Sequence, residues 1–99
     1  MQQRQIKWDK GSLAAFKSAI IYIRKQSYQN AEGVKEDILV RIEQLLVHPE
    51  MHPPDKWKEH NEGRFRAFEI HRFRISYLIK DKEIVIVRFR HTSQEPGMY

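Results

Sequence analysis

The feature that most constrains this chain is a change of hydrophobic period near Gly63. Before this residue, apolar side chains recur every three or four positions, which is the spacing of one helix face. After it they recur every second position, which is the spacing of one face of a strand. A chain of 99 residues with this pattern predicts an α+β fold, in which a helical layer covers one face of a sheet. We expect a single domain over residues 1–99.

The first half of the chain predicts a short strand followed by an amphipathic helix. Gln5 to Trp8 alternates weakly between polar and apolar residues, as a brief strand does. Asp9 or Ser12 can cap the next helix, because their side-chain oxygens accept the unpaired N–H groups of a first helical turn. This helix is expected to end near Gln26. Its buried stripe consists of Leu13, Phe16, Ile20 and Ile23.

A second helix is expected from Ala31 to Val47, after a short connection over residues 27–30 in which Asn30 is the cap. The buried stripe of this helix consists of Ala31, Val34, Ile38, Ile42 and Leu45. Two apolar stripes separated by so short a connection predict an antiparallel helix hairpin.

The second half predicts a loop and then a three- or four-stranded antiparallel sheet. Residues 48–63 are rich in proline, histidine and charge and have little periodicity, which indicates an ordered loop. Three strands should follow, at Arg64–Ile70, Arg72–Lys80 and Glu83–His91. His71 is expected to cap the first hairpin, and Asp81 and Lys82 should form the turn of the second.

Strict alternation assigns side chains to the two faces of this sheet. The apolar face of the middle strand should hold Phe73, Ile75, Tyr77 and Ile79, with Arg72, Arg74 and Ser76 opposite. On the last strand one face should hold Val85, Val87 and Phe89, with Ile84, Ile86, Arg88 and Arg90 opposite. In the first of the three strands the apolar phase slips between Ala67 and Phe68, which predicts a bulge there.

All of the net charge lies between Arg64 and His91. This stretch holds eight bases and three acids, and the difference equals the formal charge of +5 for the whole chain. Because the same stretch is predicted to form strands, the arginines are presented on a stiff surface. A focused basic surface attracts polyanions, and the guanidinium group suits phosphate oxygens in particular. The sequence therefore indicates a phosphate-rich partner.

The composition also excludes several classes of protein. Without cysteine the chain has neither a disulfide framework nor a thiolate zinc site. His48, His52 and His60 lie at irregular spacing among prolines, so we expect neither a metal site nor another cofactor. No apolar leader follows Met1, and no apolar run approaches the length of a membrane span. We expect a soluble cytoplasmic protein with no membrane partner.

The order strand, helix, helix and three strands, together with two short motifs, resembles the RelE/ParE superfamily of bacterial toxins. These toxins belong to type II toxin–antitoxin modules and include the plasmid-stabilisation proteins. The first motif, Phe73-Arg74-Ile75-Ser76-Tyr77, is similar to the family's aromatic–Arg–hydrophobic–x–Tyr strand. The second, Arg88-Phe89-Arg90-His91, closes the last strand. The resemblance covers essentially the whole chain and implies a RelE/ParE-like fold.

The resemblance implies two alternative activities on one fold. RelE- and YoeB-like members are endoribonucleases, and most of them cut mRNA in the ribosomal A site and so inhibit translation. ParE-like members poison DNA gyrase and are not known as nucleases. A fold does not discriminate between functions. The number and placement of the arginines favour a ribosome-dependent mRNA endonuclease, with a ParE-like gyrase inhibitor or a non-toxic RNA- or partner-binding relic as alternatives.

RNA cleavage without a metal uses the 2′-OH of the substrate as nucleophile on the adjacent phosphate, and it needs a base, an acid and cations. By resemblance, Arg74 and Arg90 correspond to the arginines that hold the scissile phosphate. His91 is the candidate acid, because an imidazole holds a proton near neutral pH. Asp55 or Glu59 is the candidate base, and Asp55 stands about where YoeB-like proteins carry a catalytic glutamate.

Further basic and aromatic residues are expected to bind nucleic acid: Arg64, Arg66, Arg72, Arg88, Lys56, Lys58 and Trp57. The alternative for each arginine is an ordinary solvated surface charge. Trp57 is either a platform for a base or an anchor of the loop, and an anchor is favoured. Nuclease members commonly carry a tyrosine just past the final strand. Here the only downstream tyrosine is Tyr99, and the sequence leaves open whether the tail brings it back to the sheet.

The resemblance also implies partners. A co-encoded antitoxin is expected to place a partly disordered, acidic or amphipathic segment along the helix hairpin and over Arg64 to Arg90. The nuclease interpretation adds the ribosome and mRNA as partners, and the alternative interpretation adds DNA gyrase.

Overall fold

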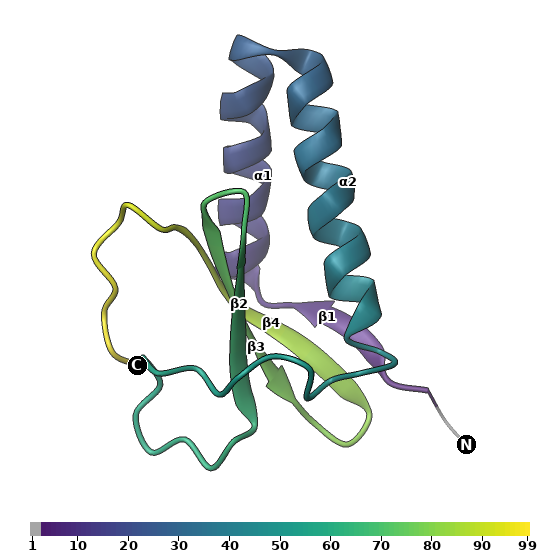
Figure 1. Cartoon of the computed structure of the whole chain (residues 1–99), viewed down its shortest axis with the longest axis vertical. Coiled ribbons are helices and arrows are strands. Elements are labelled where there is room, and N and C mark those ends of the chain that lie inside the picture. Colours follow the sequence, from purple (N-terminus) through teal and green to yellow (C-terminus); the bar gives the residue numbers. More distant parts are fainter. Residues whose placement is uncertain (1–2) are drawn as a thin grey trace.

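The chain folds as two helices on one face of a four-stranded sheet, as a computed structural model of residues 3–99 shows (Figure 1). In chain order the elements are β1 (Gln5–Trp8), α1 (Lys10–Gln26), α2 (Tyr28–Gln44), β2 (Phe65–Ile70), β3 (Phe73–Ile79) and β4 (Glu83–His91). The predicted α+β architecture and the helix hairpin are confirmed. Residues 1 and 2, which begin the segment predicted to lack an apolar leader, lie outside the described residues.

The sheet is mixed, whereas the sequence predicted an antiparallel one. Its strand order is β1-β4-β3-β2, and β2, β3 and β4 pair antiparallel as expected. β1 pairs parallel with β4, from Gln5 opposite Glu83 to Trp8 opposite Ile86. A parallel pair needs a long crossover connection, and the helix hairpin together with β2 and β3 provides it. The period of a strand does not reveal the direction of its neighbour, so the sequence missed this pairing.

The start of α1 is fixed to the sheet by two polar side chains. Asp9 is the N-cap, since its carboxylate accepts a 2.7 Å hydrogen bond from the Ser12 amide. The buried Ser12 hydroxyl donates a 2.7 Å bond to the Ile86 carbonyl on β4. The predicted apolar stripe of α1 packs into the core, with Phe16 and Ile20 buried and its other members partly buried.

α2 begins earlier than predicted. Ser27, not Asn30, is its N-cap, and the Ser27 hydroxyl accepts a 3.1 Å bond from the Asn30 amide. The Ser27 amide also donates to the Ile23 carbonyl at 2.9 Å, so one residue ends α1 and starts α2. The helix ends at Gln44 rather than Val47. The connection between the two helices is therefore the single residue Ser27 instead of residues 27–30, and Asn30 lies inside the first turn of α2.

The core side of β3 agrees with the prediction. The four predicted apolar residues of this strand are all buried in one cluster with the helices: Phe73, Ile75, Tyr77 and Ile79. The Tyr77 hydroxyl donates a 2.6 Å bond to the Pro49 carbonyl, which ties the loop after α2 to the sheet. Arg72, predicted as a strand residue, lies instead in the turn after β2, where His71 and Arg72 have φ of 51° and 67°.

The bulge lies in β4 and not in β2. Pairing of β2 with β3 is uninterrupted, whereas the β3–β4 register shifts between Ser76 and Tyr77 and leaves Val87 as the extra residue. An extra residue changes the phase of the strand. The buried side chains of β4 are consequently Ile84, Ile86 and Phe89 rather than the predicted set. The bulge leaves Arg88 and Arg90 on the face of the sheet that points away from the helices.

Candidate functional site

Three arginines gather on the face of the sheet opposite the helices, which we call the basic face: Arg74, Arg88 and Arg90. Arg74 on β3 lies directly opposite Arg90 on β4, and Ser76 lies opposite Arg88. Like charges at directly opposed positions repel. The basic face therefore depends on nearby counter-charges and hydrogen-bond acceptors.

Asp55 supplies the first counter-charge. The loop that carries it runs along the edge of β2, where the Asp55 amide donates a 2.8 Å bond to the Phe65 carbonyl. Its carboxylate is fully buried and accepts a 2.9 Å bond from Arg74, whose side chain is 11% exposed. Arg74 also contacts the exposed Glu69 at 3.1 Å. A buried charge is stable only when paired and hydrogen-bonded, and Asp55 and Arg74 satisfy this for each other.

The C-terminal tail brings Tyr99 back to the sheet, which the sequence left open. The last residues arch away from β4 and return beside the loop of residues 48–63 (Figure 1). There the Tyr99 hydroxyl donates a 2.7 Å bond to the second oxygen of Asp55, and the Tyr99 amide donates to the Trp57 carbonyl at 3.0 Å. The Arg88 guanidinium lies 4.4 Å from the centre of the Tyr99 ring. Tyr99 thus joins the loop to the basic face.

These contacts perturb the pKa values of both partners. Burial alone would raise the pKa of Asp55, but hydrogen bonds from Tyr99, Arg74, Ser76 and the Trp57 amide outweigh it and lower the pKa to about 2. Burial and the adjacent carboxylate of Asp55 raise the pKa of Tyr99. At neutral pH Asp55 is therefore an ionised acceptor and Tyr99 a protonated donor. A carboxylate with so low a pKa is a weak base.

Arg88 and Arg90 are held by backbone carbonyls and not by ion pairs within residues 3–99. Arg88 donates to the Gly97 carbonyl at 2.7 Å and Arg90 to the Gln94 carbonyl at 3.1 Å. Within residues 3–99 neither forms an ion pair with a carboxylate. Burial, Arg88 and Arg74 together lower the pKa of Arg90. Backbone carbonyls of the segment that arches over β4 orient these two arginines without neutralising them.

His91 is not on the basic face. It pairs with Phe73 across β3 and β4, and its ring lies 5.5 Å from the Phe73 ring on the helix side of the sheet. The His91 Nδ1 lies 2.6 Å from the Ser93 hydroxyl and accepts from the Ser93 amide at 3.1 Å. The structure brings Arg74, Arg90 and Asp55 together, as the sequence predicted, but it separates His91 from them by the thickness of the sheet.

The predicted loop residues surround Tyr99 rather than an open cleft. Lys58 donates to the Tyr99 carbonyl at 3.2 Å, and its ammonium lies 4.8 Å from the centre of the Phe65 ring. Glu59 contacts Tyr99 through its backbone amide, and its side chain is exposed. Lys56 is exposed and lies over the ring of half-buried Trp57 at 5.5 Å.

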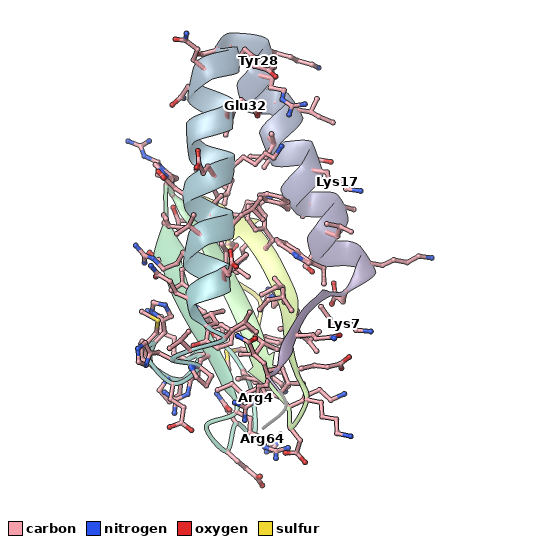
Figure 2. The ribbon with its side chains drawn as sticks, turned by 90° about the vertical axis from the view of Figure 1, so that its right-hand side faces the viewer. Arg4, Lys7, Lys17, Tyr28, Glu32 and Arg64 are labelled. Carbon is pink, nitrogen blue, oxygen red and sulfur yellow. The ribbon has the colours of Figure 1, made fainter. Side chains whose placement is uncertain are left out.

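The three remaining predicted arginines lie elsewhere. Arg66 pairs with Tyr77 and is on the helix side, where it donates to the carbonyls of His52 at 2.7 Å and Gly63 at 3.0 Å. Its guanidinium therefore holds the loop of residues 48–63. Arg64 is exposed near Arg4, at the end of the molecule opposite Tyr28 and the hairpin tip (Figure 2). Arg72 is exposed in the turn between β2 and β3.

Sequence reasoning missed two contributors to the site. Ser76 is buried on the same face of β3 as Arg74 and helps to lower the pKa of Asp55. The carbonyls of Gln94 and Gly97 orient the arginines of β4. A small polar residue among the arginines of a strand was the available signal for Ser76. Backbone carbonyls leave no signal, because every residue type provides one.

Two structural absences hold for residues 3–99. Neither helix there is long and apolar enough to cross a membrane. The same residues contain no group of three or more histidine, aspartate or glutamate side chains arranged to hold a metal ion.

Two solved structures share the fold of this chain. A chain of the chromosomal ParDE toxin–antitoxin system from P. aeruginosa superposes with a TM-score of 0.69 at 17% identity, covering 90% of this chain and 96% of that chain. The conserved hypothetical protein HP0894 from Helicobacter pylori superposes with a TM-score of 0.55 at 16% identity, covering 92% and 97%. No curated protein sequence matches the chain. The α+β fold is that of the RelE/ParE superfamily.

A match at the level of sequence assigns the chain to one family within this superfamily. The family described as "ParE toxin of type II toxin-antitoxin system, parDE" matches residues 6–96. The chain therefore belongs to the ParE family of type II toxins. The predicted superfamily is confirmed, and the family that matches within it is that of the ParE toxins. The mRNA endonuclease activity expected from the sequence stays a prediction.

Proposed function

We propose that this toxin binds and inhibits DNA gyrase and catalyses no reaction of its own. The family match over residues 6–96 supports the ParE-like alternative. The observation that carries the proposal is the position of Arg74 and His91 on opposite faces of the sheet. A toxin that acts by docking needs a stable surface of defined shape and charge, and it needs no acid and base around one phosphate.

The chemistry of Asp55 also supports docking over RNA cleavage. A general base works best when its pKa lies near the operating pH, and it must reach the proton that it removes. Asp55 has a pKa of about 2, is fully buried, and has both carboxylate oxygens occupied by Arg74 and Tyr99. We propose that Asp55 organises the basic face and that the face forms part of the surface that contacts gyrase.

A ParE-family toxin pairs with a cognate antitoxin. We expect an acidic or amphipathic segment of the antitoxin to lie along the helix hairpin and to reach the basic face. A groove of about 600 Å³ between the hairpin and the β2–β3 turn supports this expectation, because Ala19, Ile23 and Phe73 give it an apolar wall. The exposed Tyr22 and Arg72 line the same groove and offer an aromatic and a basic contact.

The test compares two targets with one protein preparation. Purified toxin is added to a gyrase supercoiling reaction and, in parallel, to cell-free translation with primer extension on the mRNA. We expect loss of supercoiling and intact mRNA. Ribosome-dependent breaks that vanish when the mRNA carries a 2′-deoxy residue at the cut position would overturn the proposal. Arg90→Gln tests whether the basic face is used, and Arg64→Gln is the control with the same change of charge.

A further inference from the structure

The two helices of the hairpin carry charges of opposite sign. α1 contains four bases and no acid, and α2 contains two bases and four acids, which gives formal charges of +4 and −2. The helices are joined through the single residue Ser27 and run side by side (Figure 1), so a basic and an acidic surface lie next to each other along the whole hairpin.

Part of this charge forms one row on each helix, and we call the surface made by the two rows the outer face of the hairpin. Residues three and four positions apart on a helix share a face. The α1 row consists of Lys10, Ala14, Lys17, Ile21 and Arg24, and the α2 row consists of Glu32, Glu36, Leu39 and Glu43. Arg24 and Glu32 form a 3.2 Å ion pair, so the rows adjoin on the same side of the hairpin. Figure 2 views the hairpin with the sheet behind it and labels Lys17 and Glu32.

The outer face offers both charged and apolar contacts. Within residues 3–99, ion pairs engage none of four of its charged side chains, which are Lys10, Lys17, Glu36 and Glu43. Ile21 is 53% exposed and Leu39 is 39% exposed between them. The outer face shares no residue with the apolar groove beside the β2–β3 turn, so an antitoxin segment in that groove leaves it accessible.

The two rows mirror each other about the tip of the hairpin. Lys17 and Glu36 lie equally far from the connection at Ser27, and so do Lys10 and Glu43. Because both helices rise by the same amount per residue, the members of each pair stand at the same height on the hairpin. A two-fold axis parallel to the helices sets α1 of one copy against α2 of the other. Lys17 then faces Glu36 of the second copy, and Lys10 faces Glu43, in both halves of the contact. A two-fold interface needs a patch that complements itself, and the outer face has this property.

We propose that the outer face binds the same face of a second copy of this chain, so that two hairpins pack as four helices. A helix of 17 residues is about 25 Å long, and two helices side by side are about 20 Å wide. The contact therefore covers about 500 Å² on each copy, near the lower limit of specific interfaces. A dimer of this size that depends on exposed charges is weak and is dissociated by salt. Docking on gyrase through the basic face does not require the dimer, so the inference goes beyond the proposed function.

The experiment measures sedimentation of the full chain at concentrations from micromolar to millimolar, in low and in high salt. Wild-type protein is expected to dimerise as its concentration rises, and less so in high salt. Lys17→Glu and Glu36→Lys should each weaken dimerisation about tenfold or more, because like charges then face each other in both halves of the contact. An equal mixture of the two variants should associate as tightly as wild type, since each changed charge then faces one of the opposite sign. Lys82→Glu makes the same change of charge in the exposed β3–β4 turn and should dimerise like wild type.

A wild-type protein that stays monomeric at every concentration would overturn the proposal. Association that survives both single changes places the contact on another face and overturns it as well, and so does a mixture that fails to recover. Lysine and glutamate both favour helices, and circular dichroism checks that each variant keeps its fold. Lys10→Glu and Glu43→Lys form a second reciprocal pair, which keeps the test decisive if a variant at position 17 or 36 is unstable.

Discussion

Tyr99 donates a 2.7 Å hydrogen bond to the buried carboxylate of Asp55, 44 positions earlier in the chain. This bond joins the last residue of the chain to the loop of residues 48–63 and places the Tyr99 ring against the guanidinium of Arg88. Asp55 in turn binds Arg74 on β3. The basic face is thus organised by one carboxylate that contacts a strand and the returning tail at the same time.

Tyr99→Phe should lower the free energy of unfolding by about 2 kcal/mol, since a hydrogen bond to a charged acceptor contributes about 1.5–3 kcal/mol. The ring stays, so the contact with Arg88 is kept and the change isolates the hydroxyl. Urea denaturation measures the difference. Tyr22→Phe is the matched control, because Tyr22 is 65% exposed on α1 and should change stability by less than about 0.5 kcal/mol.

Arg74→Ala should destabilise the protein by about 3–5 kcal/mol, because it leaves the Asp55 carboxylate buried without its cation. Chemical denaturation measures this loss, and Arg64→Ala on an exposed side chain should stay within about 0.5 kcal/mol of wild type. In a double-mutant cycle, Asp55→Asn added to Arg74→Ala should cost much less than the sum of the two changes. Simple additivity would show that the pair is not coupled.

Stability should fall in acid through Asp55. Its pKa is about 2 in the folded protein against an ordinary value of 3.8, so the folded state favours the ionised form. The resulting stabilisation is complete above about pH 5 and is lost as the pH falls from about 4 through about 2, in total about 2 kcal/mol. When the free energy of unfolding is measured against pH, the Asp55→Asn variant should lack this fall in stability between about pH 4 and pH 2. The Asp81→Asn variant, changed at an exposed aspartate, should still show it.

His91→Gln should leave gyrase inhibition within a factor of about two of wild type, because His91 lies on the helix side of the sheet. Arg90→Gln should weaken inhibition roughly tenfold or more, because it removes a charge from the proposed contact surface. Concentration series in a supercoiling assay give both values. A larger loss for His91→Gln than for Arg90→Gln would move the contact surface to the helix side.

Ser27→Ala should lower the free energy of unfolding by about 1 kcal/mol, the usual contribution of an N-cap hydroxyl. Asn30→Ala should change it far less, since Asn30 lies inside the first turn of α2 and only its backbone amide is capped. Thermal unfolding of the two variants compares the cap found in the structure with the one expected from the sequence. Equal effects would indicate that Asn30 also contributes to capping.

Features of the fold that depend on residues close together in the sequence could be predicted. The buried face of β3 follows from a period of two over Phe73 to Ile79, and the stripe of α1 follows from a period near 3.6. Asp9 was predictable as a cap because capping involves residues three positions apart. The resemblance placed Asp55 and Arg74 in the same site, but it did not predict that they form an ion pair.

Features that depend on two distant segments were decided by the tertiary structure. The parallel pairing of β1 with β4 joins residues 78 positions apart, such as Gln5 and Glu83. The bulge at Val87 depends on the register against β3, and it alone sets which face Arg88, Arg90 and His91 occupy. The sequence by itself determined the elements, the basic charge and the family resemblance, because these are properties of short segments. Only the fold decided that Tyr99 meets Asp55 and that His91 does not meet Arg74, since register and chain return are fixed by packing over the whole molecule.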